Sequence, residues 1–244
     1  MLLAPLALAA LVFPPPAVAP RDSAAVPACE AVAATVAAAD RLPDVVAALT
    51  AHRGAVRWAA DGQPVRVWIQ RRPTDGASLS HGAHEWRDAV VAAATAWTGS
   101  VPGLRVTIVR DSAAADVHVR WTPVLQPSAI GDPAAGSLAA DGATGTALAP
   151  FTAGRTTLVP DATGRAVRAE VVLAAGSLDG APYLPRDVHA IAQHEMGHVL
   201  GLAHHRSSTS VMSQLIAVDR VADDDRAVLR ALYALPIGAP CAPR

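Results

Sequence analysis

An eleven-residue stretch, HEMGHVLGLAH from His194 to His204, constrains the fold of this chain more than any other feature. His194 and His198 are four residues apart, so on an α-helix both imidazoles lie on one face and can reach one metal ion. Gly201 is predicted to end that helix, because glycine enters the left-handed region without steric cost. The chain then turns back and offers His204 as a third nitrogen. Three protein ligands leave a fourth position for water, which is the arrangement of a catalytic zinc site and not of a closed structural one.

Glu195 follows the first histidine and is predicted to be the catalytic base. It lies one step round the helix from His194, so it can approach the open metal position without being a ligand. In that role it takes a proton from a zinc-activated water and later delivers the proton to the leaving amine. The three histidines are expected to bind one Zn²⁺ ion as neutral imidazoles. HExxH alone occurs by chance, but the longer pattern fixes five residue types, which chance rarely produces.

The pattern H-E-x-x-H-x-x-G-x-x-H followed by a methionine turn is the signature of the metzincin zinc proteases. Met212 follows His204 after a short Ser/Thr-rich loop and resembles the methionine of that turn. The order of the predicted elements resembles the matrixin branch of the metzincins over roughly residues 56–236. This resemblance implies an α+β, metzincin (zincin-like) fold. A twisted, mostly parallel sheet would pack on the active-site helix and one other helix, with a small C-terminal subdomain that contains a helix.

Hydrophobic periodicity places these elements along the chain. Alternating or continuous apolar segments predict strands at residues 65–70, 104–110, 116–121, 156–159 and 166–174. Helical spacing predicts helices at 84–98, from Pro185 and from Asp223, and two short helices at 29–39 and 44–51 that are separated at Pro43. Residues 123–153 are rich in Gly, Pro, Asp and Ala, which predicts a loop with a short edge strand at 145–149.

Three features depart from the matrixin pattern, and one is that Ser213, Gln214 and Leu215 follow the methionine turn, where matrixins usually have a proline. His205 stands where matrixins usually have Ser, and we expect it to support the site or lie on the surface, because adjacent residues cannot readily both face one metal. No histidine occurs between His118 and His189, so a second zinc in the long loop is not expected. No loop motif supports calcium binding, for which the candidate ligands would be Asp132, Asp141, Asp161 and Asp179.

Composition and length indicate one domain with short additions. The chain has 244 residues and a formal charge of −1, which gives no support for nucleic-acid or polybasic membrane binding. Residues 1–19 are predicted to be a signal peptide, because their apolar run is too short for a membrane span and ends in an A-x-A-like site. Residues 20–55 are interpreted as an N-terminal arm or short propeptide, and residues 56–240 as the protease domain. We expect a secreted monomer.

The chain contains two cysteines, Cys29 before the protease domain and Cys241 after its last helix. An exported chain meets an oxidising compartment, and an even count favours a disulfide between them. The bond would tie the N-terminal arm to the C-terminal tail. Three alternatives stay open: two free thiols, a lipid on Cys29, or Cys29 held over the zinc as a latency device.

These observations predict a secreted zinc-dependent endopeptidase of the metalloendopeptidase class. An extended peptide substrate is expected to add to the edge strand of the sheet. Leu215, Ile216 and Val218 are expected to line a specificity pocket that prefers a medium or large apolar residue just after the scissile bond; alternatively, they only pack the C-terminal part. Two other functions remain open: a catalytically weak metzincin-like domain that binds zinc or protein, and a peptidase for cell-wall or other peptides.

Overall fold

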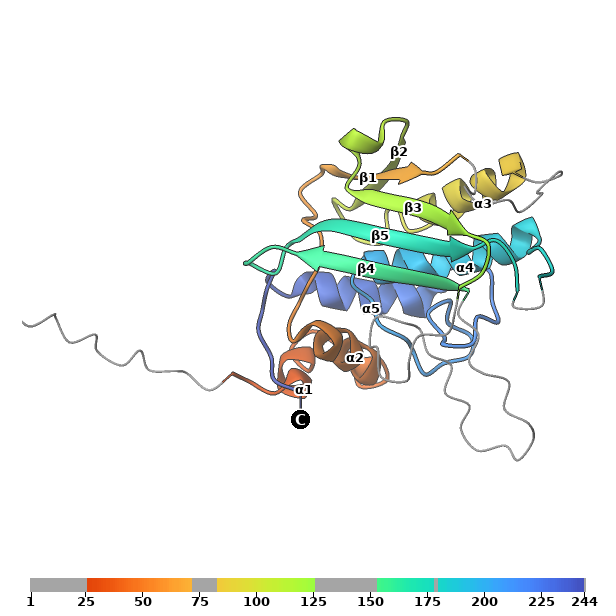
Figure 1. Ribbon diagram of the computed structural model, residues 1–244. Helices are drawn as coiled ribbons and strands as arrows, with labels where there is room; N and C mark the ends of the chain where they lie inside the picture. The colour runs from red at the N-terminus through yellow and green to blue at the C-terminus, as the bar shows by residue number, and fades with distance from the viewer. Residues whose placement is uncertain (1–25, 72–82, 126–152, 178–179, 244) are drawn as a thin grey trace, which may run out of the picture.

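A five-stranded sheet forms one layer of the computed structural model, which describes residues 26–71, 83–125, 153–177 and 180–243 (Figure 1). Its strands are β1 (Pro64–Ile69), β2 (Arg105–Val109), β3 (Val117–Thr122), β4 (Gly154–Pro160) and β5 (Ala166–Ala174). They lie in the order β2-β1-β3-β5-β4. The β1–β2, β1–β3 and β3–β5 pairs are parallel, and β4 runs antiparallel to β5 at one edge. The predicted, mostly parallel sheet is therefore confirmed.

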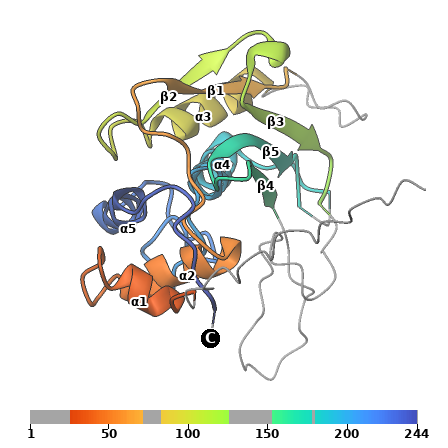
Figure 2. The same cartoon turned by 90° about the vertical axis from the view of Figure 1, so that its left-hand side faces the viewer.

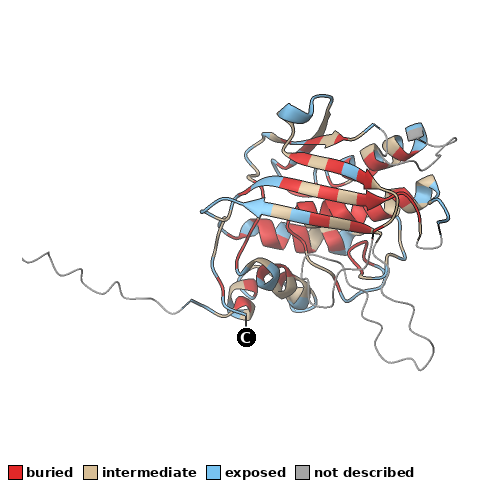
Figure 3. Ribbon diagram, in the orientation of Figure 1, coloured by how far each residue is buried: buried red, intermediate tan, exposed pale blue. Residues whose placement is uncertain are grey.

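Two helices pack on one face of this sheet, α3 (Ala83–Thr95) and α4 (Pro185–Val199), and they also contact each other. Burial alternates along the strands, as Figure 3 shows: Val67 and Val119 are buried, whereas Arg66 and Arg120 are exposed. The buried residues therefore face the two helices, which explains the period of two in the sequence. A further helix, α5 (Asp223–Ala234), lies on the side of α4 that faces away from the sheet (Figure 1). The predicted α+β class is confirmed.

The sequence-based boundaries agree with these elements except near the N-terminus. Helix α1 (Cys29–Ala33) is shorter than the predicted 29–39 and is followed by turns. Helix α2 (Leu42–His52) contains Pro43 in its first turn, where the prediction placed a break. Proline fits there because its fixed φ suits a helix and its missing N–H would have no partner within the first turn. The predicted signal peptide at 1–19 and the predicted edge strand at 145–149 lie outside the described residues.

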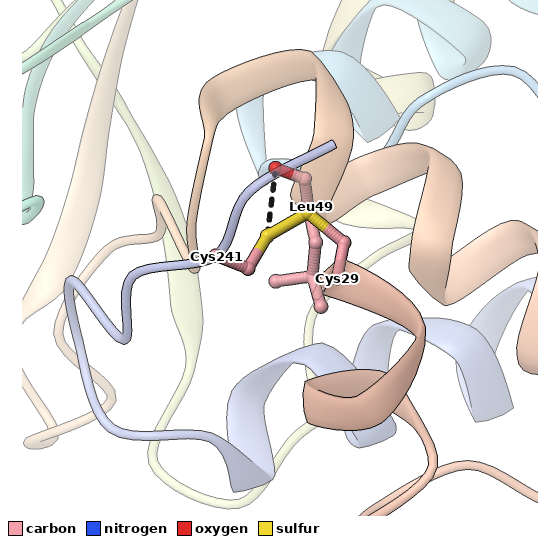
Figure 4. The surroundings of a disulfide bond; sticks show 3 residues. All are labelled: Cys29, Leu49 and Cys241. Carbon is pink, nitrogen blue, oxygen red and sulfur yellow. Dashed lines mark hydrogen bonds between the residues drawn. A yellow bond between two sulfur atoms is a disulfide. The ribbon is translucent and has the colours of Figure 1, made fainter. Parts of the chain in front are cut away.

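The N-terminal arm packs against the C-terminal part of the chain (Figure 2). A disulfide joins Cys29 to Cys241, with 4.8 Å between their Cα atoms (Figure 4). The predicted pairing is therefore confirmed, and Cys29 has no thiol left to block a metal or carry a lipid. None of the helices in the described part of the chain combines the length and apolar character that a membrane crossing requires.

Candidate metal centre

Helix α4 carries the first half of the site, and local sequence defines both its ends. Pro185 begins the helix, and the Asp187 carboxylate accepts a hydrogen bond of 3.0 Å from the Leu184 N–H. Gly201 has a φ of +99°, so the chain leaves the helix through the left-handed region that favours glycine. A Cβ at Gly201 would also overlap the carbonyl oxygen of Val56. Gly201 therefore lies just after the end of α4, in a conformation that suits glycine.

Two tryptophans and a methionine fix α4 in place. The Trp97 indole N–H donates to the Gln193 carbonyl at 3.1 Å, and the Trp58 indole N–H donates to the Val199 carbonyl at 2.7 Å. Met212 is fully buried, and its sulfur lies so close to Gly197 that a Cβ there would overlap it. The turn with Met212 therefore packs directly against α4 on the part of the helix that carries the histidines, as the resemblance implied.

The structure brings His194, His198 and His204 together, and their ligand atoms all lie within 4.8 Å of one another. The Nδ1–H of His194 donates to the Val211 carbonyl and that of His198 to the Leu202 carbonyl, both at 2.8 Å. Because a carbonyl only accepts, these bonds place the proton on Nδ1 and leave a lone pair on each Nε2. The Nε2 atoms of His194 and His198 are 3.1 Å apart. Two nitrogens on a tetrahedral zinc would be roughly 3.3 Å apart.

Burial favours the neutral form of the three imidazoles. It lowers the pKa of His194 to about 4 and the pKa of His198 well below its usual value. Burial also lowers the pKa of His204, and its Nε2 is buried without a hydrogen-bond partner among the described residues. Neutral imidazoles with free lone pairs are the form that binds zinc. These residues therefore fit a zinc ion, and they are the only cluster of three or more potential ligands in the described part of the chain.

Glu195 lies on α4 beside the histidines and is not one of the clustered ligands. Its side chain is buried, and one carboxylate oxygen accepts a hydrogen bond of 2.6 Å from the Thr156 hydroxyl on β4. The backbone of Gly154 lies against the same carboxylate. Burial raises the pKa of Glu195 to about 7, although the Thr156 hydroxyl and the nearby Arg155 charge oppose that shift. A carboxyl with a pKa near neutrality can both accept and return a proton.

A buried polar network supports the turn that carries Met212. The His205 N–H donates to the Met212 carbonyl at 2.8 Å, and His205 Nδ1 lies 2.9 Å from the Ser210 hydroxyl. The Ser210 hydroxyl donates in turn to Asp225, whose carboxylate also accepts the N–H of Val211 at 3.2 Å. His205 is only 5% exposed, so the option of a surface position was wrong. It holds the turn and is absent from the ligand cluster.

A cavity of about 230 Å³ opens beside the histidines. Its walls come from β4, from α4 with the loop after it, and from the C-terminal end of α2; the lining residues are Ala51, His52, Arg155, Thr156, Thr157, Leu158, Glu195, His198, Leu202, Ala203 and His204. Leu215, Ile216 and Val218 do not line this cavity. Leu215 is 66% exposed, whereas Ile216 and Val218 pack against the core. The apolar pocket assigned to them stays a prediction.

The acidic residues considered for calcium give no cluster in the part of the chain that the structure describes. Asp161 uses one carboxylate oxygen to accept hydrogen bonds from Thr163 and from the Arg165 N–H in its own turn. The other candidates, Asp132, Asp141 and Asp179, lie outside the described residues.

The sequence did not predict that Thr156, Arg155 and the C-terminal end of α2 lie at this site. Thr156 looked like an ordinary strand residue, since β-branched residues are common in strands. The antiparallel pairing of β4 with β5 places it over Glu195, and that pairing joins segments far from the zinc motif. A useful signal would have been the position of Thr156 on the inward face of the strand predicted at 156–159.

The sheet over an HExxH helix, the third histidine after a glycine turn and the buried methionine turn define a metzincin. The matrixin family profile (peptidase M10) matches residues 74–234, and the chain belongs to that family. A comparison with curated proteins gives no match. Family and histidine cluster together support zinc binding and a metalloprotease.

Replacement of His204 by Ala should remove most of the bound metal, because two histidines hold zinc poorly. Zinc per chain, measured by atomic emission after dialysis against a weak chelator, should fall from about one to near zero. His205→Ala is the matched control, since His205 is the next residue along the chain and lies outside the cluster; it should keep its zinc. Full occupancy in the His204 variant would show that the third ligand lies elsewhere.

Proposed function

We propose that this chain is a secreted zinc endopeptidase in which Glu195 is the general base and acid. The observation that carries the proposal is a buried carboxylate next to three neutral histidines, at the wall of an open cavity. A bound zinc ion would polarise the scissile carbonyl and lower the pKa of the attacking water. Glu195 would receive the proton of that water and pass it to the leaving nitrogen.

Strand β4 offers a place for the substrate backbone. It is paired with β5 on one side, and four consecutive residues from Arg155 to Leu158 line the cavity on the other. Among the described strands β4 is the last of the sheet, and an extended peptide can pair with an edge strand through its main chain, which gives affinity without a fixed sequence. Thr156 lies in this stretch and orients Glu195 through its hydroxyl, so the strand that would bind the peptide also positions the base.

Export is supported by three observations. A disulfide between Cys29 and Cys241 is typical of an oxidising compartment, and matrixins are typically extracellular. The apolar run of residues 1–19 is consistent with a signal peptide. Expression of residues 1–244 should therefore release a shortened chain into the medium, and N-terminal sequencing of that chain would locate the cleavage.

The central experiment is a digest of casein and of a mixed peptide library with the purified, zinc-loaded chain. We expect cleavage that stops when a chelator is added and returns when zinc is restored. Zinc bound at one per chain without any cleavage would instead support the alternative of a catalytically weak binding domain. Cleavage of short peptides, without cleavage of casein, would favour a peptidase for cell-wall or other peptides.

The predicted pocket at Leu215, Ile216 and Val218 has its own test. If these side chains contact the substrate, medium or large apolar residues should occur just after the cleaved bonds. They should be found there about ten times or more as often as charged residues. Mass spectrometry of the library digest gives this preference directly. A charged preference at that position would reject the pocket and leave these residues a packing role.

A further inference from the structure

We propose that helix α2 forms one wall of a substrate subsite next to the metal, so that the N-terminal arm belongs to the working enzyme and is not a removable propeptide. In this arrangement Ala51 and His52 determine which substrate side chain fits. The proposal rests on the peptidase function above and adds a specificity wall to the same site.

The C-terminal end of α2 lines the cavity beside the three histidines. Ala51 and His52 line the same space as Glu195, His198 and His204, with residues 155–158 of β4 also in its lining. Ala51 is exposed, and His52 is half-buried. A peptide that follows the edge of β4 in this cavity would therefore present a side chain to the C-terminal turn of α2.

A second contact ties α2 to the loop that carries the third histidine. The Asp44 carboxylate accepts a hydrogen bond of 3.3 Å from the Arg206 N–H, two residues after His204. A neighbouring cavity of about 370 Å³ is lined by α2 residues together with His204 and Arg206. The position of α2 is thus coupled to the metal-binding loop as well as to the substrate space.

The arm is anchored as a permanent part of the domain. In addition to the disulfide, Arg41 forms an ion pair of 2.6 Å with Asp224 at the start of α5. The apolar side of α2 belongs to the main core, in which Val45, Ala48 and Leu49 are buried. Removal of the arm would expose this apolar surface and the residues beneath it to water, which is unfavourable.

The chain after α2 is also fixed by backbone bonds. The Ala55 N–H donates to the Ala239 carbonyl at 3.0 Å, and the Gly238 N–H donates to the Ala55 carbonyl at 2.9 Å. Directly after α2, Arg53 adopts a φ of +56°, a left-handed conformation that is uncommon outside glycine, and its carbonyl accepts the Cys241 N–H at 3.2 Å. The position of His52 is therefore held by its own helix and by the C-terminal tail.

The residues of the α2 wall predict the size of the substrate side chain. Ala51 and His52 line the same cavity as residues 155–158 of β4, so the His52 imidazole occupies room that a substrate side chain between β4 and α2 would need. We therefore expect peptides with a small side chain, such as Gly, Ala or Ser, at the position that faces His52.

The test compares kcat/KM for peptides that differ only by Ala or Leu at one position, scanned on both sides of the scissile bond. His52→Ala enlarges the subsite and should raise the Leu-to-Ala ratio about tenfold at one position only. Ala51→Leu fills the same space and should lower kcat/KM for Leu further and shift the preference toward Gly. Ala31→Leu, on the exposed side of α1, is the matched control and should change neither ratio.

A binding measurement separates this wall from the peptidase function. Zinc-loaded Glu195→Gln, with and without His52→Ala, is titrated with the same Ala and Leu peptides by calorimetry. Tighter binding of the Leu peptide when His52→Ala is added supports the proposal that α2 forms a wall of the subsite, even if wild-type turnover is absent. Unchanged ratios in all α2 variants would overturn the wall while leaving the peptidase function intact, and an active exported enzyme that lacks residues 26–55 would overturn it as well.

Discussion

Glu195→Ala should lower kcat/KM by roughly 10²- to 10⁴-fold while the zinc content stays near one per chain. The reason is that the histidines and Glu195, on neighbouring positions of one helix, have different roles. His194 and His198 present free Nε2 lone pairs to the metal, whereas the Glu195 carboxylate turns to Thr156 on β4 and is absent from the ligand cluster. Its loss therefore removes the proton carrier and not a ligand. Peptide turnover and metal analysis on the same sample measure both effects.

Glu195→Gln is the matched variant for this experiment. Glutamine keeps the shape of the side chain, and its carbonyl oxygen can still accept the Thr156 hydroxyl, but it cannot take up a proton at neutral pH. It should be as inactive as the Ala variant and fold as well as wild type, because the cavity beside Gly154 stays filled. Turnover within tenfold of wild type in either variant would show that another group moves the proton.

The zinc motif and most of the sheet were predictable because their signals are local. A helix places residues four apart on one face, and Gly201 ends that helix, so the spacing itself brought His194, His198 and His204 together. The alternation of apolar and polar residues in the sequence predicted β1 and β3 in the same way. Both signals depend on the backbone geometry of a short segment, which the sequence reports directly.

The remaining parts of the site depend on contacts between distant segments. His52 reaches the cavity because α2 packs on the tail and on the Arg206 loop, and nothing in the sequence around His52 indicates those partners. Thr156 contacts Glu195 because β4 pairs with β5, and that pairing is not visible in the sequence around either residue. His205 is a single residue without periodicity, so its burial against Ser210 could not be separated from a surface position.

The disulfide between Cys29 and Cys241 should raise the free energy of unfolding by about 5 kcal/mol in the chain-entropy model, because 212 residues separate the two cysteines. Residual structure in the unfolded chain reduces this effect, so we expect 2 to 5 kcal/mol, roughly, for the variant Cys29→Ala/Cys241→Ala. Alanine is chosen because both positions are buried, and serine would bury a hydroxyl. Urea unfolding at fixed zinc concentration measures the difference.

The same urea curves also show whether the disulfide acts mainly on the unfolded or on the folded state. A cross-link that acts mainly on the unfolded chain makes it more compact, so the wild-type slope against urea should be smaller than the slope of the alanine variant. Reductant is the matched control: it should move wild type to the midpoint of the variant and leave the variant unchanged. Equal midpoints for oxidised wild type and variant would mean that the backbone bonds between the arm and the tail, such as Cys29 N–H to the Ala242 carbonyl at 3.1 Å, already hold the two ends together as firmly as the disulfide does.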